Sequence, residues 1–199
     1  SDVYKRQYFQ AVGSGTGAIA AWENAERLAA DGRFGKNNMR IYASQNAPFT
    51  IMYDSWKNHS RELVPMTPEE SRTKAEVILG KVLSNRKPPY SIAGGLFDVL
   101  EKSGGDMFKV TNDEIVSWVV RYYSAEGYDI FPASACAVAS LKQALDNGTV
   151  KKDETIMLNV TGGGMLSATR KGFILKEPDL VLSPELPAEE IIAAIDKLF

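Results

Sequence analysis

The stretch Gly13-Ser14-Gly15-Thr16-Gly17 decides the fold that this sequence predicts. It follows a short apolar run and precedes a segment whose apolar residues recur at helical spacing. A strand, a glycine-rich turn and a helix start make a site for an anion, because glycine lets backbone N–H groups point inward and the helix terminus adds positive dipole. The two hydroxyl side chains add hydrogen-bond donors. The sequence therefore predicts a phosphate-binding loop here.

The elements around this loop predict an α/β fold. We expect a helix over 18–30, ended by Gly32, and then a strand over 39–44. Strand, loop, helix and strand form a βαβ unit, which requires parallel pairing. A buried strand is expected at 155–160, and a helix of small residues at 135–145 is expected to pack closely on the sheet. The predicted fold is an open, mostly parallel twisted sheet with helices on both faces.

Further elements follow from capping residues and periodicity. Thr67-Pro-Glu-Glu and the capping box Thr111-Asn-Asp-Glu114 each start a helix. A short strand or an extended segment is expected at 128–131, and an amphipathic helix at 187–198. In the helix after Thr111, four apolar residues are predicted to face a core: Ile115, Val116, Val119 and Val120.

Composition excludes several classes of protein. The chain has 199 residues, 44% hydrophobic and 24% charged, with a net charge of −2, so neither nucleic acid nor a membrane surface is an expected partner. No apolar stretch approaches the roughly 20 residues of a membrane helix, and no secretory signal is recognisable. The single cysteine, Cys136, suits a reducing cytoplasm. With one histidine, His59, a zinc site of Cys/His type is excluded.

Most isolated reactive residues have ordinary explanations. His59 lies in a polar segment and is expected to be solvated, and Cys136 lies among small apolar residues and is expected to be buried. Arg86, beside two prolines, is a candidate contact for an anionic substrate, although a solvated loop is the preferred explanation.

The first seven residues, Ser1 to Gln7, match the translation of a transposon-end adaptor used in sequencing. We therefore expect that they are not native, and that residues 8–199 are the C-terminal portion of a longer protein, folded as a single α/β domain. A native polar N-terminal strand is the alternative for the first seven residues.

The glycine loop also fits the dinucleotide fingerprint, which requires an acidic residue about 20 residues further on, at the next strand end. That end is Ser44-Gln45-Asn46, without an acid, and no Walker lysine follows the loop. A second glycine-marked strand end, Thr161-Gly162-Gly163-Gly164, suits a flat ligand ring, with the threonine hydroxyl directed at it. A plain tight turn is the alternative.

Several motifs together resemble fold-type II pyridoxal-phosphate enzymes of the tryptophan synthase β superfamily, in the threonine synthase branch. Within that branch the chain is most similar to the cysteate synthase family. The resemblance covers the chain from Tyr8 to about Gly164 and rests on these segments: Tyr8–Gly17, Asp31–Gly35, Asn85–Ser91, Gly94-Gly95-Leu96, Glu126-Gly127, Pro132–Ala135 and Val160–Gly164.

The resemblance implies roles and a reaction. Gly13 to Gly17 would hold the phosphate of pyridoxal 5'-phosphate, and Thr161, followed by Gly162, would offer its hydroxyl to the pyridine nitrogen. The implied reaction is a β-replacement in coenzyme M biosynthesis of methanogens, in which O-phospho-L-serine and sulfite give L-cysteate and phosphate. The implied enzyme is cytoplasmic and homodimeric. Threonine synthase, acting on O-phosphohomoserine, and a non-catalytic phosphate- or nucleotide-binding module remain as alternatives.

In this family the lysine that binds the cofactor covalently lies upstream of the glycine loop. No lysine of this chain matches it, so no catalytic residue is assigned here and the chain alone is expected to be inactive.

Overall fold

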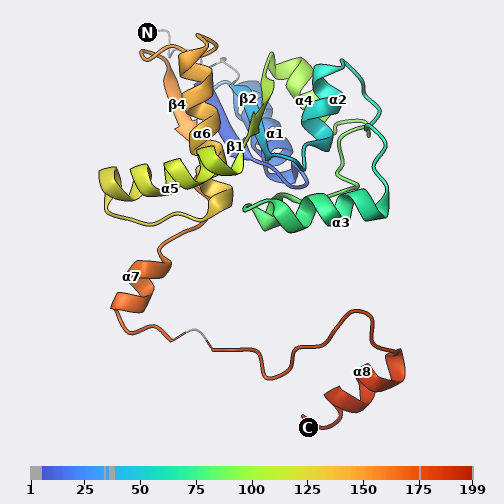
Figure 1. Cartoon of the computed structure of the whole chain (residues 1–199). Helices are drawn as coiled ribbons and strands as arrows, with labels where there is room; N and C mark the ends of the chain where they lie inside the picture. The colour runs from blue at the N-terminus through green and yellow to red at the C-terminus, as the bar shows by residue number, and fades with distance from the viewer. Residues whose placement is uncertain (1–5, 34, 36–38, 175, 199) are drawn as a thin grey trace. The chain divides into compact units, whose positions relative to one another are not determined.

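The computed structural model describes residues 6–33, 35, 39–174 and 176–198 (Figure 1). Residues 1–5 of the expected adaptor lie outside the described residues. The contacts gather in two units, one up to residue 166 and one from residue 167. The assignment of residues 8–199 to a single domain stays a prediction.

The first unit contains a four-stranded sheet in the order β3-β2-β1-β4. All pairings are parallel. In register, Phe9 lies opposite both Tyr42 and Leu158. The strands are β1 (Arg6–Ala11), β2 (Arg40–Asn46), β3 (Asp106–Val110) and β4 (Thr155–Leu158). The sequence-predicted α/β class with a parallel sheet is confirmed.

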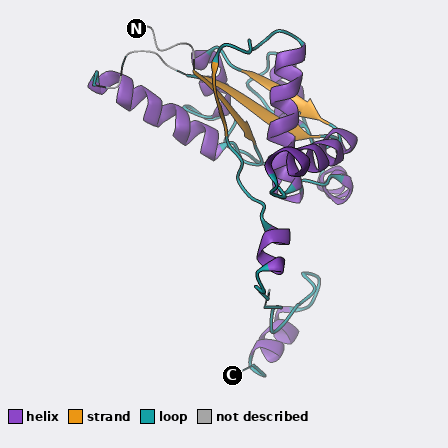
Figure 2. Cartoon of the chain, turned by 90° about the vertical axis from the view of Figure 1, so that its left-hand side faces the viewer, coloured by secondary structure: helices purple, strands orange, loops and turns teal. Residues whose placement is uncertain are grey.

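Helices cover both faces of this sheet (Figure 2). One face packs against α1 (Thr16–Asp31), α2 (Ile51–Lys57) and α4 (Leu96–Ser103). Trp22 of α1 and Leu100 of α4 are buried there with Ile41 of β2. Burying side chains of this size removes them from water at a gain of about 1.5–3 kcal/mol each, which holds the layers together.

The opposite face packs against α6 (Pro132–Asp146), on which α5 (Asn112–Glu126) lies. Residues 133–140 of α6 are all buried, and their small side chains allow the helix to approach the strands closely. Phe9 and Tyr42 stack on this face with ring centroids 4.7 Å apart. The predicted close packing of this helix is confirmed.

The predicted caps are also confirmed. Thr67 and Thr111 each form a complete capping box, at the start of α3 (Pro68–Val77) and of α5. α1 ends at Gly32, whose φ of 79° is the left-handed conformation that glycine adopts without steric cost. A short 3₁₀ turn, η1 (Lys81–Leu83), was not predicted.

Two expectations were wrong. In α5 only Ile115 is buried, whereas Val116 and Val120 are 53% and 60% exposed. β4 was expected to be buried, yet it lies at the sheet edge and Met157 is 61% exposed, because α6 packs only against Ile156 and Leu158 on one face of this strand. The segment 128–131, expected as a short strand or an extended segment, forms one antiparallel bridge, between Ile130 and Gly163.

Residues beyond 166 form the second unit. α7 (Met165–Arg170) crosses the boundary, and α8 (Ala188–Ile195) follows. The predicted amphipathic helix therefore exists, with Ile192 57% exposed. Among the described helices, none has the length and hydropathy that crossing a bilayer requires.

Candidate functional site

The glycine loop joins β1 to α1 at the carboxyl end of the sheet. Gly15 caps the helix with a φ of 82°, which residues with a side chain rarely adopt. A Cβ on Gly13 would lie 2.5 Å from the carbonyl oxygen of Val82, and one on Gly17 would lie 2.5 Å from Nε2 of Gln10. The backbone therefore requires glycine at residues 13 and 15, whereas a side chain at residue 17 would have to displace the Gln10 amide.

The loop presents backbone donors. Within the described part of the chain, the amides of Ser14, Gly15, Gly17 and Ala18 have no hydrogen-bond partner. The hydroxyls of Ser14 and Thr16 lie 2.9 Å apart, and both side chains are partly or fully exposed. Free amides at a helix N-terminus attract an anion through hydrogen bonds and the helix dipole. The loop thus has the free backbone donors that an anion site requires, and anion binding at residues 13–17 stays a prediction.

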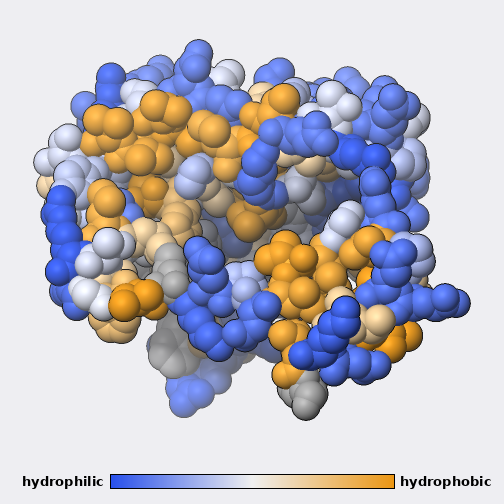
Figure 3. Space-filling view, turned by 60° about the horizontal axis from the view of Figure 1, so that its bottom comes forward, coloured by the Kyte–Doolittle hydropathy of each residue, from blue (hydrophilic) through white to orange (hydrophobic). Residues whose placement is uncertain are grey.

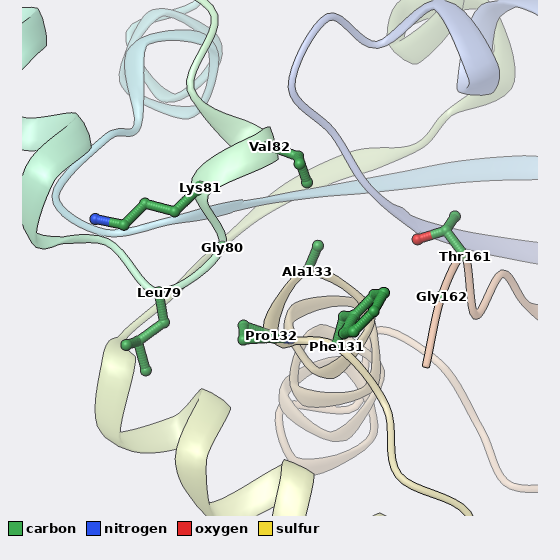
Figure 4. Close-up of a pocket in the computed structure, with 9 residues that line it drawn as sticks. All are labelled: Leu79, Gly80, Lys81, Val82, Phe131, Pro132, Ala133, Thr161 and Gly162. Carbon is green, nitrogen blue, oxygen red and sulfur yellow. The ribbon is translucent and has the colours of Figure 1, made fainter. Parts of the chain in front are cut away.

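A cleft of about 340 Å³ lies beside this loop. Val82 is in its wall, and the contact of that residue's carbonyl with Gly13 places the glycine loop against the same wall. Figure 4 shows the Thr161 hydroxyl directed into the cleft from the opposite side. The volume is within the range of small-molecule sites. The lining residues are Leu79, Gly80, Lys81, Val82, Phe131, Pro132, Ala133, Thr161 and Gly162.

The far wall of the cleft is held by Ser134, which the sequence did not identify as a site residue. Its buried hydroxyl donates to the Gly162 carbonyl at 2.9 Å and accepts from the Gly162 amide at 3.0 Å. Phe131 also donates its amide to that carbonyl. Nothing in the local sequence indicates that a serine in α6 bonds to a glycine 28 residues away.

A second buried polar side chain fixes the near wall. Asn46 is fully buried at the end of β2, and its Oδ1 accepts from the Gly80 amide at 2.9 Å. Its Nδ2 donates to Asn112 at 3.0 Å, and Asn112 in turn accepts from the Leu79 amide. The turn that lines the cleft is therefore tied to two strand ends of the sheet.

Two basic residues near the cleft differ in position. Lys81 lines it, yet its amino group donates to the carbonyls of Ala75 and Glu76 and points away from Thr161 (Figure 4). Arg86 is half-buried in the irregular segment after η1 and is not among the lining residues.

The two residues expected to be non-catalytic lie as predicted. His59 is exposed, and Cys136 is fully buried. Burial raises the pKa of the Cys136 thiol to about 12, although its hydrogen bond with Ser44 acts in the opposite direction. Among the residues that the structure describes, no three His, Cys, Asp or Glu side chains gather as metal ligands would.

The sequence model of the family described as "Pyridoxal-phosphate dependent enzyme" matches residues 5–162. The matched range contains the glycine loop, the cleft and Thr161. The chain belongs to this family. The predicted family and its cofactor, pyridoxal phosphate, are therefore confirmed.

Curated relatives of this chain carry the name of one enzyme of this family. The cysteate synthase of Methanocella paludicola is 46% identical over 191 residues, which cover 94% of this chain and 44% of the relative. That of Methanosarcina acetivorans is 43% identical over 188 residues, covering 92% and 45%. The chain therefore spans less than half the length of the curated relatives it matches.

Solved structures share the fold at low sequence identity. Serine racemase from Dictyostelium discoideum superposes with a TM-score of 0.54 at 17% identity, covering 83% of this chain and 45% of that one. Threonine deaminase isoform 2 from Solanum lycopersicum gives 0.52 at 15% identity, covering 86% and 41%.

The cleft fits half of such a cofactor's requirements. Free amides beside Gly15 suit a phosphate, and a hydroxyl on the opposite wall suits a ring nitrogen. The cleft wall between these groups is mainly apolar. Apolar side chains are also exposed on the face of the molecule seen in Figure 3. Among the described residues that line the cleft, no lysine directs its amine into it, because the amino group of Lys81 is turned away.

Proposed function

We propose that the whole protein is a pyridoxal-phosphate-dependent β-replacement enzyme of the cysteate synthase type. It would convert O-phospho-L-serine and sulfite into L-cysteate and phosphate. The observation that carries this proposal is the pairing of the glycine cradle with Thr161 across one cleft. The proposal is further supported by relatives named cysteate synthase at 41–46% identity.

In this proposal the chain's own residues bind and orient the cofactor. The amides of Ser14 to Gly17 hold its phosphate, and the hydroxyl of Thr161 donates a hydrogen bond to the ring nitrogen. Gly162 has no side chain, and the Phe131 ring, which also lines the cleft, lies where its Cβ would be. When bound, the cofactor supplies an electron sink for bond cleavage at the substrate. A neutral hydroxyl beside the nitrogen, in place of a carboxylate, leaves that nitrogen largely unprotonated, which suits β-replacement.

The covalent lysine is proposed to lie outside this chain, upstream of the glycine loop in the whole protein. Arg86 remains a candidate contact for the anionic groups of the substrate. We further propose that the whole protein is a cytoplasmic homodimer with a small anionic amino acid and sulfite as its substrates.

The test is an assay of the full-length protein with O-phospho-L-serine and sulfite, in which cysteate and phosphate are measured. Equal amounts of the two products are expected. Formation of threonine from O-phosphohomoserine, without cysteate, would assign the protein to the threonine synthases. Activity with neither substrate, together with retained phosphate binding, would favour a non-catalytic binding module.

A further inference from the structure

Ser134 is almost completely buried, with 1% of its surface exposed, in the first turn of α6. Its hydroxyl leaves the helix and contacts both backbone polar groups of Gly162, at 2.9 and 3.0 Å. A Cβ on Gly162 would lie 2.7 Å from the Phe131 ring, so this segment approaches α6 as closely as backbone allows. Ser134 is therefore the side chain that holds Gly162, together with the backbone amide of Phe131, which donates to the same carbonyl at 3.0 Å.

The same hydroxyl lies 3.4 Å from Oγ1 of Thr161. A serine hydroxyl has one proton, and that of Ser134 is donated to the Gly162 carbonyl at the shorter distance of 2.9 Å. In the contact between the two hydroxyls, Thr161 must therefore be the donor. At 3.4 Å this hydrogen bond is longer than the usual range for O–H···O, so the Thr161 proton remains available to a better acceptor.

We propose that Ser134 is a positioning residue that orients the Thr161 hydroxyl toward a heteroaromatic nitrogen in the cleft. Its hydrogen bonds with the amide and the carbonyl of Gly162 fix the backbone next to Thr161. Its contact with the Thr161 hydroxyl is long, so that this hydroxyl can donate a hydrogen bond to the ring nitrogen instead. This inference rests on the proposed function, since it requires a nitrogen-containing ring in the cleft.

A purely structural serine in the same helix provides the comparison. Ser140 is also fully buried in α6, and its hydroxyl donates to the Ala137 carbonyl of its own helix at 2.7 Å. The two serines have the same residue type, helix and burial. They differ in that Ser134 alone of the two bonds to the strand end bearing Thr161.

The test uses the full-length protein freed of cofactor, with two probes. Pyridoxine 5'-phosphate carries the ring and the phosphate but no aldehyde, so it forms no covalent bond with lysine; inorganic phosphate carries the anion alone. Ser134→Ala is expected to weaken pyridoxine 5'-phosphate binding about three- to tenfold, the range of one hydrogen bond, and to leave phosphate binding unchanged. Ser140→Ala is expected to change neither. Titration calorimetry and phosphorus NMR measure the two affinities.

A double mutant separates positioning from direct contact. If Ser134 acts through Thr161, the variant carrying Ser134→Ala and Thr161→Val binds pyridoxine 5'-phosphate no more weakly than Thr161→Val alone. Should Ser134→Ala fail to fold, Ser134→Cys, which is slightly larger than serine and forms weaker hydrogen bonds, replaces it in both titrations.

Equal weakening for both probes, no weakening for either, or additive losses in the double mutant would overturn the positioning role and leave the proposed function intact. Failure of the unmodified protein to bind pyridoxine 5'-phosphate would instead overturn the proposed function, and the positioning role with it.

Discussion

Nδ2 of Asn159 donates to the hydroxyl oxygen of Tyr8 at 2.9 Å and so joins the end of β4 to β1. The Tyr8 hydroxyl in turn donates to Oε1 of Gln10 at 2.8 Å. The other end of that amide, Nε2, occupies the space that a side chain on Gly17 would need. A chain of polar contacts therefore runs from two residues before Thr161 to the glycine loop.

Tyr8→Phe removes the central hydroxyl of this chain and keeps the ring. We expect a loss of about 1–2 kcal/mol in the free energy of unfolding, because Asn159 and Gln10 each lose a partner. We also expect weaker phosphate binding, because Gln10 is then free to move beneath Gly17. Urea unfolding and phosphate titration measure the two effects.

Tyr53→Phe is the matched control, since the half-buried Tyr53 hydroxyl makes no hydrogen bond within the described part of the chain. If both variants lose equal stability and equal phosphate affinity, the polar chain does not couple the strand end to the loop.

Gly13→Ala places a methyl group 2.5 Å from a backbone carbonyl of η1, which is not the end of a flexible side chain. Either the loop or the cleft wall must shift, and overpacking of this kind costs about 1–3 kcal/mol. Because the loop is the proposed phosphate site, cofactor affinity is expected to fall more than tenfold. Fluorescence titration with pyridoxal phosphate measures it.

The control for the loop is Gly148→Ala at the end of α6. Gly148 has a φ of 76° and open space around its Cβ position, so the variant adds only local backbone strain, of order 1 kcal/mol. Its cofactor affinity is expected to be unchanged. An equal loss of affinity in the two variants would indicate general destabilisation.

The buried thiol of Cys136 makes stability depend on alkaline pH. Its pKa is about 12 in the folded chain against 9.0 for an unperturbed thiol, so between these values the unfolded state binds fewer protons. The free energy of unfolding should therefore fall as pH rises through this window, by at most about 1.4 kcal/mol per pH unit for this group. The slope is measured by urea unfolding from pH 8 to 11.

Burial also raises the pKa of Tyr8, Tyr42 and Tyr90, which contribute in the same direction. Cys136→Ala isolates the thiol, because only its part of the slope should disappear. An identical slope in the variant would show that the thiol does not retain its proton in the folded state.

The sequence predicted what local rules determine. The structure confirmed the helix starts at Thr67 and Thr111 and the helix end at Gly32, because each depends on a few neighbouring residues. The exposure of Val116 and Met157 was predicted wrongly, because a periodic pattern shows which residues are apolar and not which neighbour covers them. Ser134 was missed as a site residue because its partner is distant in sequence.

The chain alone is expected to form no Schiff base with pyridoxal phosphate, since Lys81, the lysine in the cleft wall, is already bound to two carbonyls and faces away. After mixing, the absorbance spectrum should remain that of free pyridoxal phosphate, without a Schiff-base band. A lysine-linked adduct, found by mass spectrometry after borohydride reduction, would contradict this expectation.

The most direct test of the account is a crystal structure of the full-length protein with pyridoxal phosphate bound. The account predicts the phosphate within hydrogen-bond distance of the amides of residues 14–17 and the ring nitrogen within hydrogen-bond distance of Oγ1 of Thr161. A phosphate held at another loop, or a ring nitrogen facing a different side chain, would contradict it.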